Sequence, residues 1–231
     1  MQKPHVVVLT GAGISAESGL ATFRGMGGMW EEYRIEDVAS ITAWHRNPAL
    51  VLEFYNQRRK AAAQAQPNEG HKALAKLEEK YSVTVITQNV DDLHERAGSS
   101  NVIHLHGKLS EVRSEKYPDL IFDIGGGAIQ VGDLCPRGSQ LRPNIVWFGE
   151  AVPMIEIAAQ IAATADIFLI IGTSLVVYPA AGLVHNAPYR AEKYLIDPHI
   201  PELPYGLQLT TIAEPATTGV PKLVNTLLER L

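Results

Sequence analysis

Hydrophobic and polar positions alternate along the chain in two rhythms. Short runs rich in β-branched residues, which are typical of buried strands, lie at residues 5–10, 83–87, 102–105, 167–171 and 193–197. Longer segments whose apolar residues follow a helical spacing lie at residues 48–65, 68–80, 154–164, 180–187 and 219–231. Strands that alternate with helices predict an α/β fold, in which helices cover both faces of a mostly parallel sheet.

One region does not follow this pattern. Residues 110–145 contain three consecutive glycines, Gly125 to Gly127, and short apolar runs without a helical period. They predict a small module inserted in the main sheet. We expect one domain over residues 1–231. Its expected pieces are a large part at about 1–30, 83–109 and 143–231, a small helical module at about 31–82, and the inserted module at about 110–142.

The first predicted strand ends in a turn that is typical of dinucleotide binding. The run of Val6 to Leu9 stops at Gly11-Ala12-Gly13, and a helix-like pattern follows through Ala16. Glycines let the backbone approach a phosphate, and a helix N-terminus favours the anion. This loose Gly-x-Gly-x-x-Ala fingerprint predicts a Rossmann-like sheet, with a tight turn that binds no ligand as the alternative.

The acidic residue that usually completes this fingerprint is missing. A dinucleotide oxidoreductase places Asp or Glu at the end of a second strand, about 20 residues further on. Here three glycines within residues 25–28 disfavour a strand, and Glu31 and Glu32 end none. The sequence therefore indicates a nucleotide site that is not built for ordinary hydride transfer.

Polar residues follow several of the predicted strands. Gln88 to Asp91 come after the strand at 83–87, His106-Gly107 after 102–105, and Gly172 to Ser174 after 167–171. Each cluster alone is compatible with a simple turn or helix cap. Since ligands of open α/β sheets bind outside the carboxyl ends of the strands, we expect these clusters to converge on one crevice.

Composition excludes several classes of protein. The net charge of −5 argues against a nucleic-acid binder, and no apolar run reaches the ~18 residues of a membrane span. The N-terminal apolar run is too short for a signal peptide. Cys135 is the single cysteine, which excludes an internal disulfide framework and fits a reducing compartment. We therefore expect a cytoplasmic protein that binds neither membranes nor nucleic acid directly.

Six motifs, in family order, resemble the sirtuin family of NAD-dependent protein deacylases. They lie at residues 11–19, 22–24, 87–94, 104–107, 142–150 and 172–175. The resemblance implies that the chain removes acyl groups from lysines of substrate proteins with NAD as co-substrate, releasing nicotinamide and O-acyl-ADP-ribose. Two other functions stay open: a mono-ADP-ribosyltransferase with the same NAD site, and a non-catalytic NAD-binding sensor.

The resemblance also implies roles for individual residues. His106 and Asn89 are the expected catalytic residues, with His106 as the base that deprotonates a ribose hydroxyl, a role suited to a group whose pKa lies near working pH. Phe23 and Arg24 would cover the cofactor, and Asp91 would hold its nicotinamide end with Asn89. The full set expected to bind NAD is Gly11, Ala12, Gly13, Ser15, Glu17, Thr22, Phe23, Arg24, Trp30, Gln88, Asn89, Val90, Asp91, Gly172, Thr173, Ser174, Leu195, Asp197 and Ala216.

The expected substrate site lies on a predicted helix and a predicted strand. Tyr55 and Arg58 are three residues apart on the helix, so they share a face. They resemble the Tyr-x-x-Arg of sirtuins that accept dicarboxylic acyl groups, which implies a preference for succinyl or malonyl over acetyl. A solvated helix face is the alternative. The strand is expected to pair with the substrate peptide through Val146, Phe148, Gly149 and Glu150, with ordinary core packing as the alternative.

The chain departs from the family at the zinc site. Many sirtuins bind a structural zinc through four cysteines in two Cys-x-x-Cys pairs, and tetrahedral zinc needs four good ligands. Here only Cys135 is present, and Ser114 and Gly138 stand at partner positions. We therefore expect no zinc and no other metal. The oligomeric state stays open, a monomer being one option.

Overall fold

The computed structural model describes residues 3–21, 29–30, 33–201 and 207–231 of the chain. Their centre is a parallel sheet of six strands in the order β11-β10-β9-β1-β4-β5. This is the strand order of a doubly wound nucleotide-binding sheet. After β1, the chain adds β4 and β5 on one side and then β9, β10 and β11 on the other, so the order reverses between β1 and β9. The strands are β1 (His5–Thr10), β4 (Ser82–Thr87), β5 (Val102–His104), β9 (Ile167–Ile171), β10 (Glu192–Ile196) and β11 (Thr210–Ile212).

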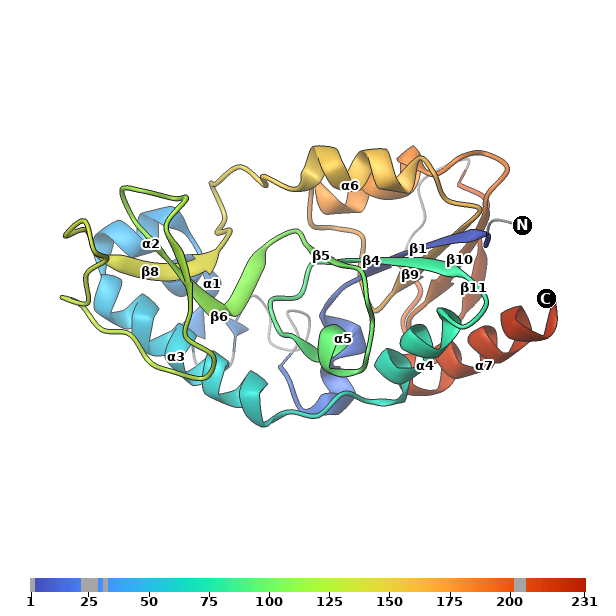
Figure 1. The fold of residues 1–231 in the computed structure, drawn as a ribbon, viewed down its shortest axis with the longest axis horizontal. Coiled ribbons are helices and arrows are strands. Elements are labelled where there is room, and N and C mark those ends of the chain that lie inside the picture. Colours follow the sequence, from blue (N-terminus) through green and yellow to red (C-terminus); the bar gives the residue numbers. More distant parts are fainter. Residues whose placement is uncertain (1–2, 22–28, 31–32, 202–206) are drawn as a thin grey trace.

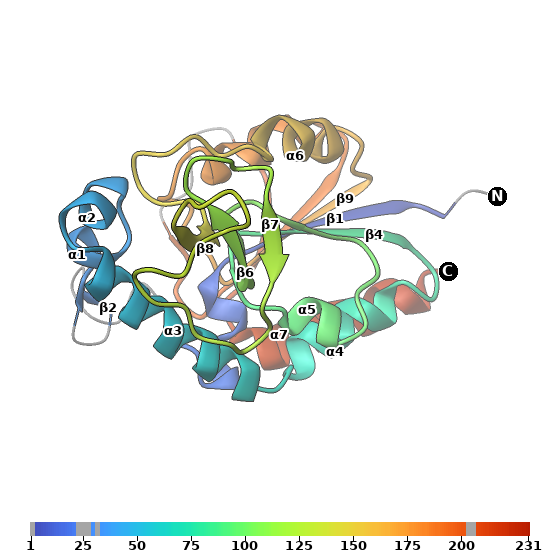
Figure 2. The same cartoon turned by 60° about the vertical axis from the view of Figure 1, so that its left-hand side comes forward.

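Helices cover both faces of this sheet, as the sequence predicts (Figures 1 and 2). On β1, Val6 and Val8 pack with the residues of α4 (Glu69–Leu77) and α7 (Ala216–Glu229). The alternate residues Val7 and Leu9 face α6 (Ile155–Ala162) and the 3-10 helix η3 (Ala180–Asn186). Because successive side chains of a strand point to opposite faces, a continuous β-branched run is what a sheet buried on both sides requires.

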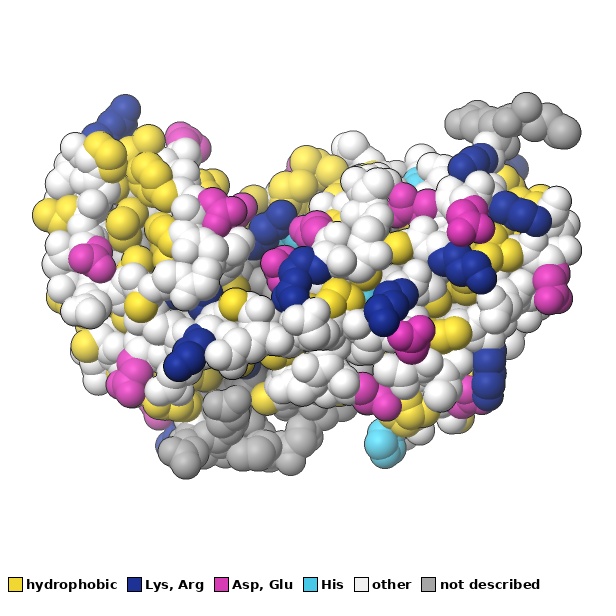
Figure 3. Space-filling view, turned by 60° about the horizontal axis from the view of Figure 1, so that its bottom comes forward, with side chains coloured by type: hydrophobic (Ala, Val, Ile, Leu, Met, Phe, Trp, Pro, Cys, Tyr) yellow, Lys and Arg dark blue, Asp and Glu magenta, His cyan; other side chains and the backbone are white. Residues whose placement is uncertain are grey.

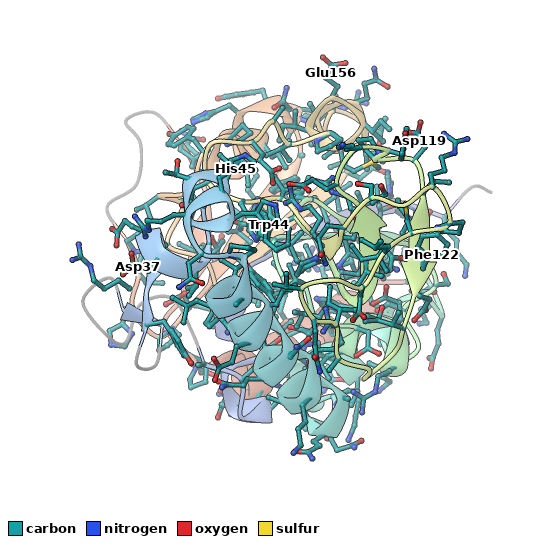
Figure 4. The ribbon with its side chains drawn as sticks, turned by 90° about the vertical axis from the view of Figure 1, so that its left-hand side faces the viewer. Asp37, Trp44, His45, Asp119, Phe122 and Glu156 are labelled. Atoms are coloured by element: carbon teal, nitrogen blue, oxygen red, sulfur yellow. The ribbon has the colours of Figure 1, made fainter. Side chains whose placement is uncertain are left out.

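A smaller part lies beside the sheet, at the left of Figure 1. It contains a three-stranded antiparallel sheet in the order β7-β6-β8. Figure 4 looks onto this part, with Trp44 near the centre and Asp37 and Asp119 towards the outside. Its elements are β2 (Met29–Trp30), β3 (Tyr33–Arg34), α1 (Ile35–Val38), α2 (Ile41–Arg46), α3 (Pro48–Gln64), β6 (Gly107–Ser114), β7 (Ile121–Asp123) and β8 (Leu141–Ile145).

Local sequence explains where the long helices begin. Pro48 stands at the start of α3, and the Asn47 side chain caps it by accepting a hydrogen bond from Leu50 N. Asn68 and His71 form a reciprocal capping box at the start of α4. α7 begins at Ala216, three residues before the predicted start, and continues through Pro221.

Helix α4 lies with the large part and not with the smaller one. Its residues Leu74 and Leu77 are fully buried in the core that α7 and the sheet share. The sequence grouped this helix with the helical module at 31–82, because short helices that follow each other look alike in a hydrophobicity pattern. Residues 12–18 also differ from the helix expected there, since they form two short 3-10 turns, η1 (Ala12–Ile14) and η2 (Ala16–Ser18).

Hydrogen bonds hold the tip of the smaller part, where zinc ligands would stand. The Ser114 hydroxyl accepts from Tyr117 N at 3.2 Å and from the Cys135 thiol at 3.4 Å. The Ser139 hydroxyl accepts from Lys116 N at 3.2 Å. Within the described ranges, no group of three or more His, Cys, Asp or Glu residues is placed to hold a metal ion. In the same residues, no helix is long and apolar enough to span a membrane.

Candidate active site

Two glycine loops meet at the point where the strand order reverses. Gly11 N donates to Ile171 O at 3.0 Å, and Gly13 N donates to Gly172 O at 2.9 Å. A Cβ on Gly13 would lie 2.6 Å from the Gly172 Cα, and a Cβ on Gly172, whose φ is +62°, would lie 2.4 Å from Ile14 N. These glycines therefore let the loops after β1 and β9 pack directly against each other.

The joined loops open onto a cavity of about 860 Å³ that both parts of the molecule line. The two parts form the left and right lobes of Figure 3, and a notch separates them at the upper edge of that view. From the large part, the predicted residues on the cavity are Gly11, Ala12, Gly13, Ser15, Glu17, Gln88, Asn89, Val90, Asp91, His106, Gly172, Thr173, Ser174 and Asp197. From the smaller part and its connection to the sheet they are Tyr55, Arg58, Val146, Phe148, Gly149 and Glu150. The convergence expected from the strand ends is thus present.

Two predicted cofactor residues do not reach the cavity. Leu195 is fully buried in the core under α6 and η3, and Ala216 is buried in the core under α7. The side chains at both positions pack into the interior and not onto the cavity. Asp197, just beyond the end of β10, and Pro215, just before α7, line the cavity instead. Thr22, Phe23 and Arg24 lie outside the described residues, as does the side chain of Trp30.

Asn89, Asp91 and Ser15 form a buried polar network. Asn89 Nδ2 donates to Gly11 O at 3.1 Å and to Ser15 Oγ at 3.2 Å. Ser15 Oγ donates to Asp91 Oδ2 at 3.2 Å. Burial raises the pKa of Asp91, although hydrogen bonds from Leu93 N and Ser15 oppose the shift. The network fixes an amide and a carboxyl group side by side at the cavity wall.

His71 supports this network from behind and was not expected from the sequence. Its Nδ1 accepts from Asn68 N at 3.3 Å, so Nε2 carries the proton and points at Ser15 Oγ, 3.4 Å away. Burial lowers its pKa to about 4, which keeps the ring neutral. The signal that could have found it is the spacing of Asn68 and His71 in the capping box of α4.

His106 is held in one tautomer. Its Nδ1 lies 3.0 Å from the Gln88 carbonyl oxygen, which can only accept, so Nδ1 carries the hydrogen. Nε2 is then the nitrogen with the lone pair. Burial lowers the pKa of His106, against the opposing effect of the Gln88 hydrogen bond. The ring is therefore neutral and basic at neutral pH, as a general base requires.

The smaller part contributes an aromatic wall. Tyr55 is 2% exposed, and its ring centroid lies 5.0 Å from Phe54 and 6.0 Å from Trp147. Burial raises the pKa of Tyr55 to about 12, although the charge of Arg58 opposes the shift. The hydroxyl therefore stays protonated. The Arg58 guanidinium lies 5.6 Å from the Phe54 ring centroid. An apolar surface with one cation and one hydroxyl suits a ligand with an acidic end.

The predicted peptide edge is partly occupied within the chain. Phe148 N donates to Ala39 O at 3.0 Å, and Phe148 O accepts from Ile41 N at 3.2 Å. The side chain of Phe148 is half-exposed, so a peptide would meet that side chain and not its backbone. The carboxylate of Glu150 is paired within the chain, because both of its oxygens accept from the Arg142 guanidinium, at 2.7 and 2.9 Å.

A doubly wound sheet with a cavity at its reversal point defines a dinucleotide-binding protein. Residues 11–179 match the model of the Sir2 family. An NAD-dependent protein deacylase of Bacteroides thetaiotaomicron is 52% identical over 229 residues, 97% of this chain and 98% of that protein. One of Helicobacter pylori is 50% identical over 225 residues, again 97% and 98%.

Solved structures agree with the sequence comparison. A Sir2 homologue in complex with NAD superposes with a TM-score of 0.88 at 39% identity, covering 99% of this chain and 91% of that one. A Sir2 protein with a p53 peptide and NAD+ gives a TM-score of 0.80 at 30% identity, covering 99% and 93%. The chain belongs to the Sir2 family, the sirtuins. It is an NAD-dependent protein deacylase, with NAD as its co-substrate.

Proposed function

We propose that this deacylase removes succinyl or malonyl groups from protein lysines in preference to acetyl groups. The observation that carries the proposal is the position of Tyr55 and Arg58, which line the same cavity as His106. An exposed face of α3 was the alternative, but Tyr55 is 2% exposed. The pair therefore supports recognition of the acyl group from within the site.

The surroundings of Arg58 favour an acidic partner. Phe54, Tyr55 and Trp147 belong to the buried apolar cluster beside the guanidinium. A carboxylate at the end of a succinyl or malonyl chain would accept charge-assisted hydrogen bonds from Arg58 and a further one from the Tyr55 hydroxyl. Such bonds contribute roughly 1.5–3 kcal/mol each. An acetyl group has no carboxylate and makes neither contact.

The remaining site residues support a division of roles around NAD. His106 suits the role of base, because the lone pair on its Nε2 could take a proton from a ribose hydroxyl of bound NAD. Asn89 and Asp91 offer an amide and a carboxyl group to the nicotinamide carboxamide, and Gln88 lies next to them for the ribose. The other predicted cofactor residues on the cavity, in the loops after β1 and β9, would hold the phosphates and ribose.

Two other functions use the same NAD site. An ADP-ribosyltransferase would need an acceptor side chain in place of acyl-lysine and would not use the carboxylate site at Tyr55 and Arg58. A non-catalytic NAD sensor would not use the base at His106. A single-turnover assay with NAD and a succinyl-lysine peptide separates the three, because only the deacylase releases both nicotinamide and free lysine.

The acyl preference is tested by Arg58→Met, which keeps the side-chain length and removes the charge. The wild-type protein is expected to favour succinyl-lysine over acetyl-lysine by ~10- to 100-fold in kcat/KM, since 1.4 kcal/mol corresponds to about tenfold. The variant should lose most of the succinyl activity and keep its acetyl activity. Lys60→Met is the matched control, an exposed cation of the same helix. Equal loss of both activities in Arg58→Met would contradict the acidic-pocket proposal.

A further inference from the structure

The loop that carries Asn89 is held by an unusual series of hydrogen bonds. Three consecutive carbonyls, of residues 88, 89 and 90, each accept one bond from the segment 104–109. Gln88 O accepts from His106 Nδ1 at 3.0 Å, and Val90 O accepts from Leu109 N at 2.8 Å. Between them, Asn89 O accepts from His104 Nδ1 at 3.1 Å. The side chains of His104 and His106 thus provide two of these three bonds, near the point where the main-chain pairing of β4 with β5 ends.

The second ring nitrogen of His104 is also engaged. Its Nε2 lies 2.8 Å from Glu95 Oε1, and the ammonium group of Lys108 lies 3.1 Å from the same oxygen. Burial alone would raise the pKa of Glu95, but the hydrogen bond and charge of His104 outweigh it and hold the pKa at about 2. Glu95 is therefore a carboxylate. Because a carbonyl oxygen only accepts, His104 donates from Nδ1 to Asn89 O, and its Nε2 pairs with Glu95 Oε1.

Glu95 links His104 to the helix that follows the loop. We call the contacts of Asn89 O with His104 and of His104 with Glu95 the clamp. Glu95 lies on α5 (Leu93–Arg96), which begins two residues after Asp91. Asp91 Oδ1 accepts from Leu93 N at 3.1 Å, so the same short helix also holds the carboxyl group of Asp91. The chain from Asn89 to α5 is thereby tied at its start and its end through the single buried ring of His104, whose side chain is 4% exposed.

We propose that His104, held by Glu95, is a positioning residue that fixes Asn89 and Asp91 for the nicotinamide group. The inference rests on the proposed role of Asn89. His104 contacts the main chain of Asn89 and not the cavity, so it acts through the position of that residue. Loosening the clamp should weaken the hold on nicotinamide and leave the acyl-peptide site, on the other wall of the cavity, as it is.

The first test is His104→Phe, which keeps a ring of similar shape and removes both ring nitrogens. The nicotinamide concentration that half-inhibits the enzyme should rise about tenfold, the scale of one charge-assisted hydrogen bond. The KM for NAD should rise with it, while the KM for the acyl peptide stays unchanged. Circular dichroism and the melting temperature report whether the variant is folded.

Glu95 provides a graded second test that leaves the His104 ring in place. Glu95→Gln keeps a polar side chain that can hydrogen-bond with His104 Nε2, so it should change nicotinamide inhibition less than Glu95→Ala does. With histidine-selective ¹⁵N labelling, the Nε2 signal of His104 should shift in Glu95→Ala and keep its wild-type position in Lys108→Met. Lys108→Met is the control, because it removes the neighbouring cation and leaves the His104–Glu95 bond intact.

Asn89→Ala separates the two hypotheses. If Asn89→Ala weakens nicotinamide inhibition while His104→Phe and Glu95→Ala do not, the role of His104 is overturned and that of Asn89 stands. If Asn89→Ala itself leaves nicotinamide inhibition unchanged, the proposed role of Asn89 fails, and the inference about His104 fails with it. A parallel rise in the KM of the peptide in His104→Phe would indicate general loosening and would also overturn the inference.

Discussion

The two walls of the cavity are built in different ways. The wall from the large part consists of loops after parallel strands, joined by main-chain bonds such as Gly13 N to Gly172 O. The wall from the smaller part consists of side chains of α3, held by aromatic packing of Tyr55 against Trp147. Most substitutions leave the main-chain geometry of the first wall unchanged, whereas a single substitution on α3 changes a contact surface of the second wall. We therefore propose that the reaction with NAD belongs to the first wall and acyl selectivity to the second.

The strongest test of this division is His106→Ala. If His106 serves the step common to all acyl groups, its loss should lower turnover at least ~100-fold, the usual scale for a general base. Succinyl- and acetyl-lysine peptides should be affected alike. NAD binding, measured by calorimetry, should change little. Near-normal turnover, or loss of activity on one acyl group only, would break the comparison.

Tyr55→Phe tests the other wall with a smaller expected effect. It removes one hydroxyl and leaves the aromatic packing of α3 in place. The kcat/KM for succinyl-lysine should fall about tenfold, as expected for loss of a hydrogen bond to a charged group. The value for acetyl-lysine should stay within about twofold. An equal fall for both peptides would show that Tyr55 acts on the shared reaction.

The acid limb of the pH profile offers a weaker but independent test. A general base acts when neutral, so the rate falls as the pH drops through its pKa. Since burial lowers the pKa of His106, the midpoint of the acid limb in kcat/KM should lie below the ordinary histidine value of about 6.5. Both acyl peptides should share it. A midpoint above that value, or different midpoints for the two peptides, would argue against His106 as the common base.

The smallest effect is expected from removal of metal ions. We propose that the tip of the smaller part folds without zinc, through the hydrogen bonds of Ser114 and Ser139. A chelator should leave the melting temperature and both acyl activities unchanged. Elemental analysis should find far less than one zinc per chain. A stoichiometric zinc that is lost together with the fold would contradict this proposal.

The sequence was most informative where one property repeats. The β-branched runs predict five of the six parallel strands, because a doubly buried strand has a continuous apolar signature. β11 was missed, since Thr210 and Thr211 are exposed and give no such signature. The antiparallel strands of the smaller part were also missed. The buried residues of β6 are Leu109, Val112 and Ser114, which do not alternate regularly, and one of its two partners, β8, lies much further along the chain.

The candidate site was predictable at strand ends and less so elsewhere. Gln88 to Asp91, His106 and Gly172 to Ser174 all line the cavity, because parallel strands bring their carboxyl ends to one edge. The side chain of Leu195 packs in the core under α6 and η3, and the sequence does not show which face of β10 a residue occupies. His71 contacts Ser15, and His104 contacts the main chain of Asn89, both from behind the cavity wall. The packing of α4 brings His71 there, and the pairing of β5 with β4 brings His104 there.

The contact between Gly13 and Gly172 constrains how this protein can be altered. Each position excludes a Cβ because of the backbone of the other loop, so a larger residue at either one cannot be rescued by trimming a side chain at its neighbour. Anyone who grafts a new loop after β1 or β9 must therefore redesign both loops as a pair. The same contact makes this junction a poor place for an insertion, a permutation point or a screen that randomises one loop alone.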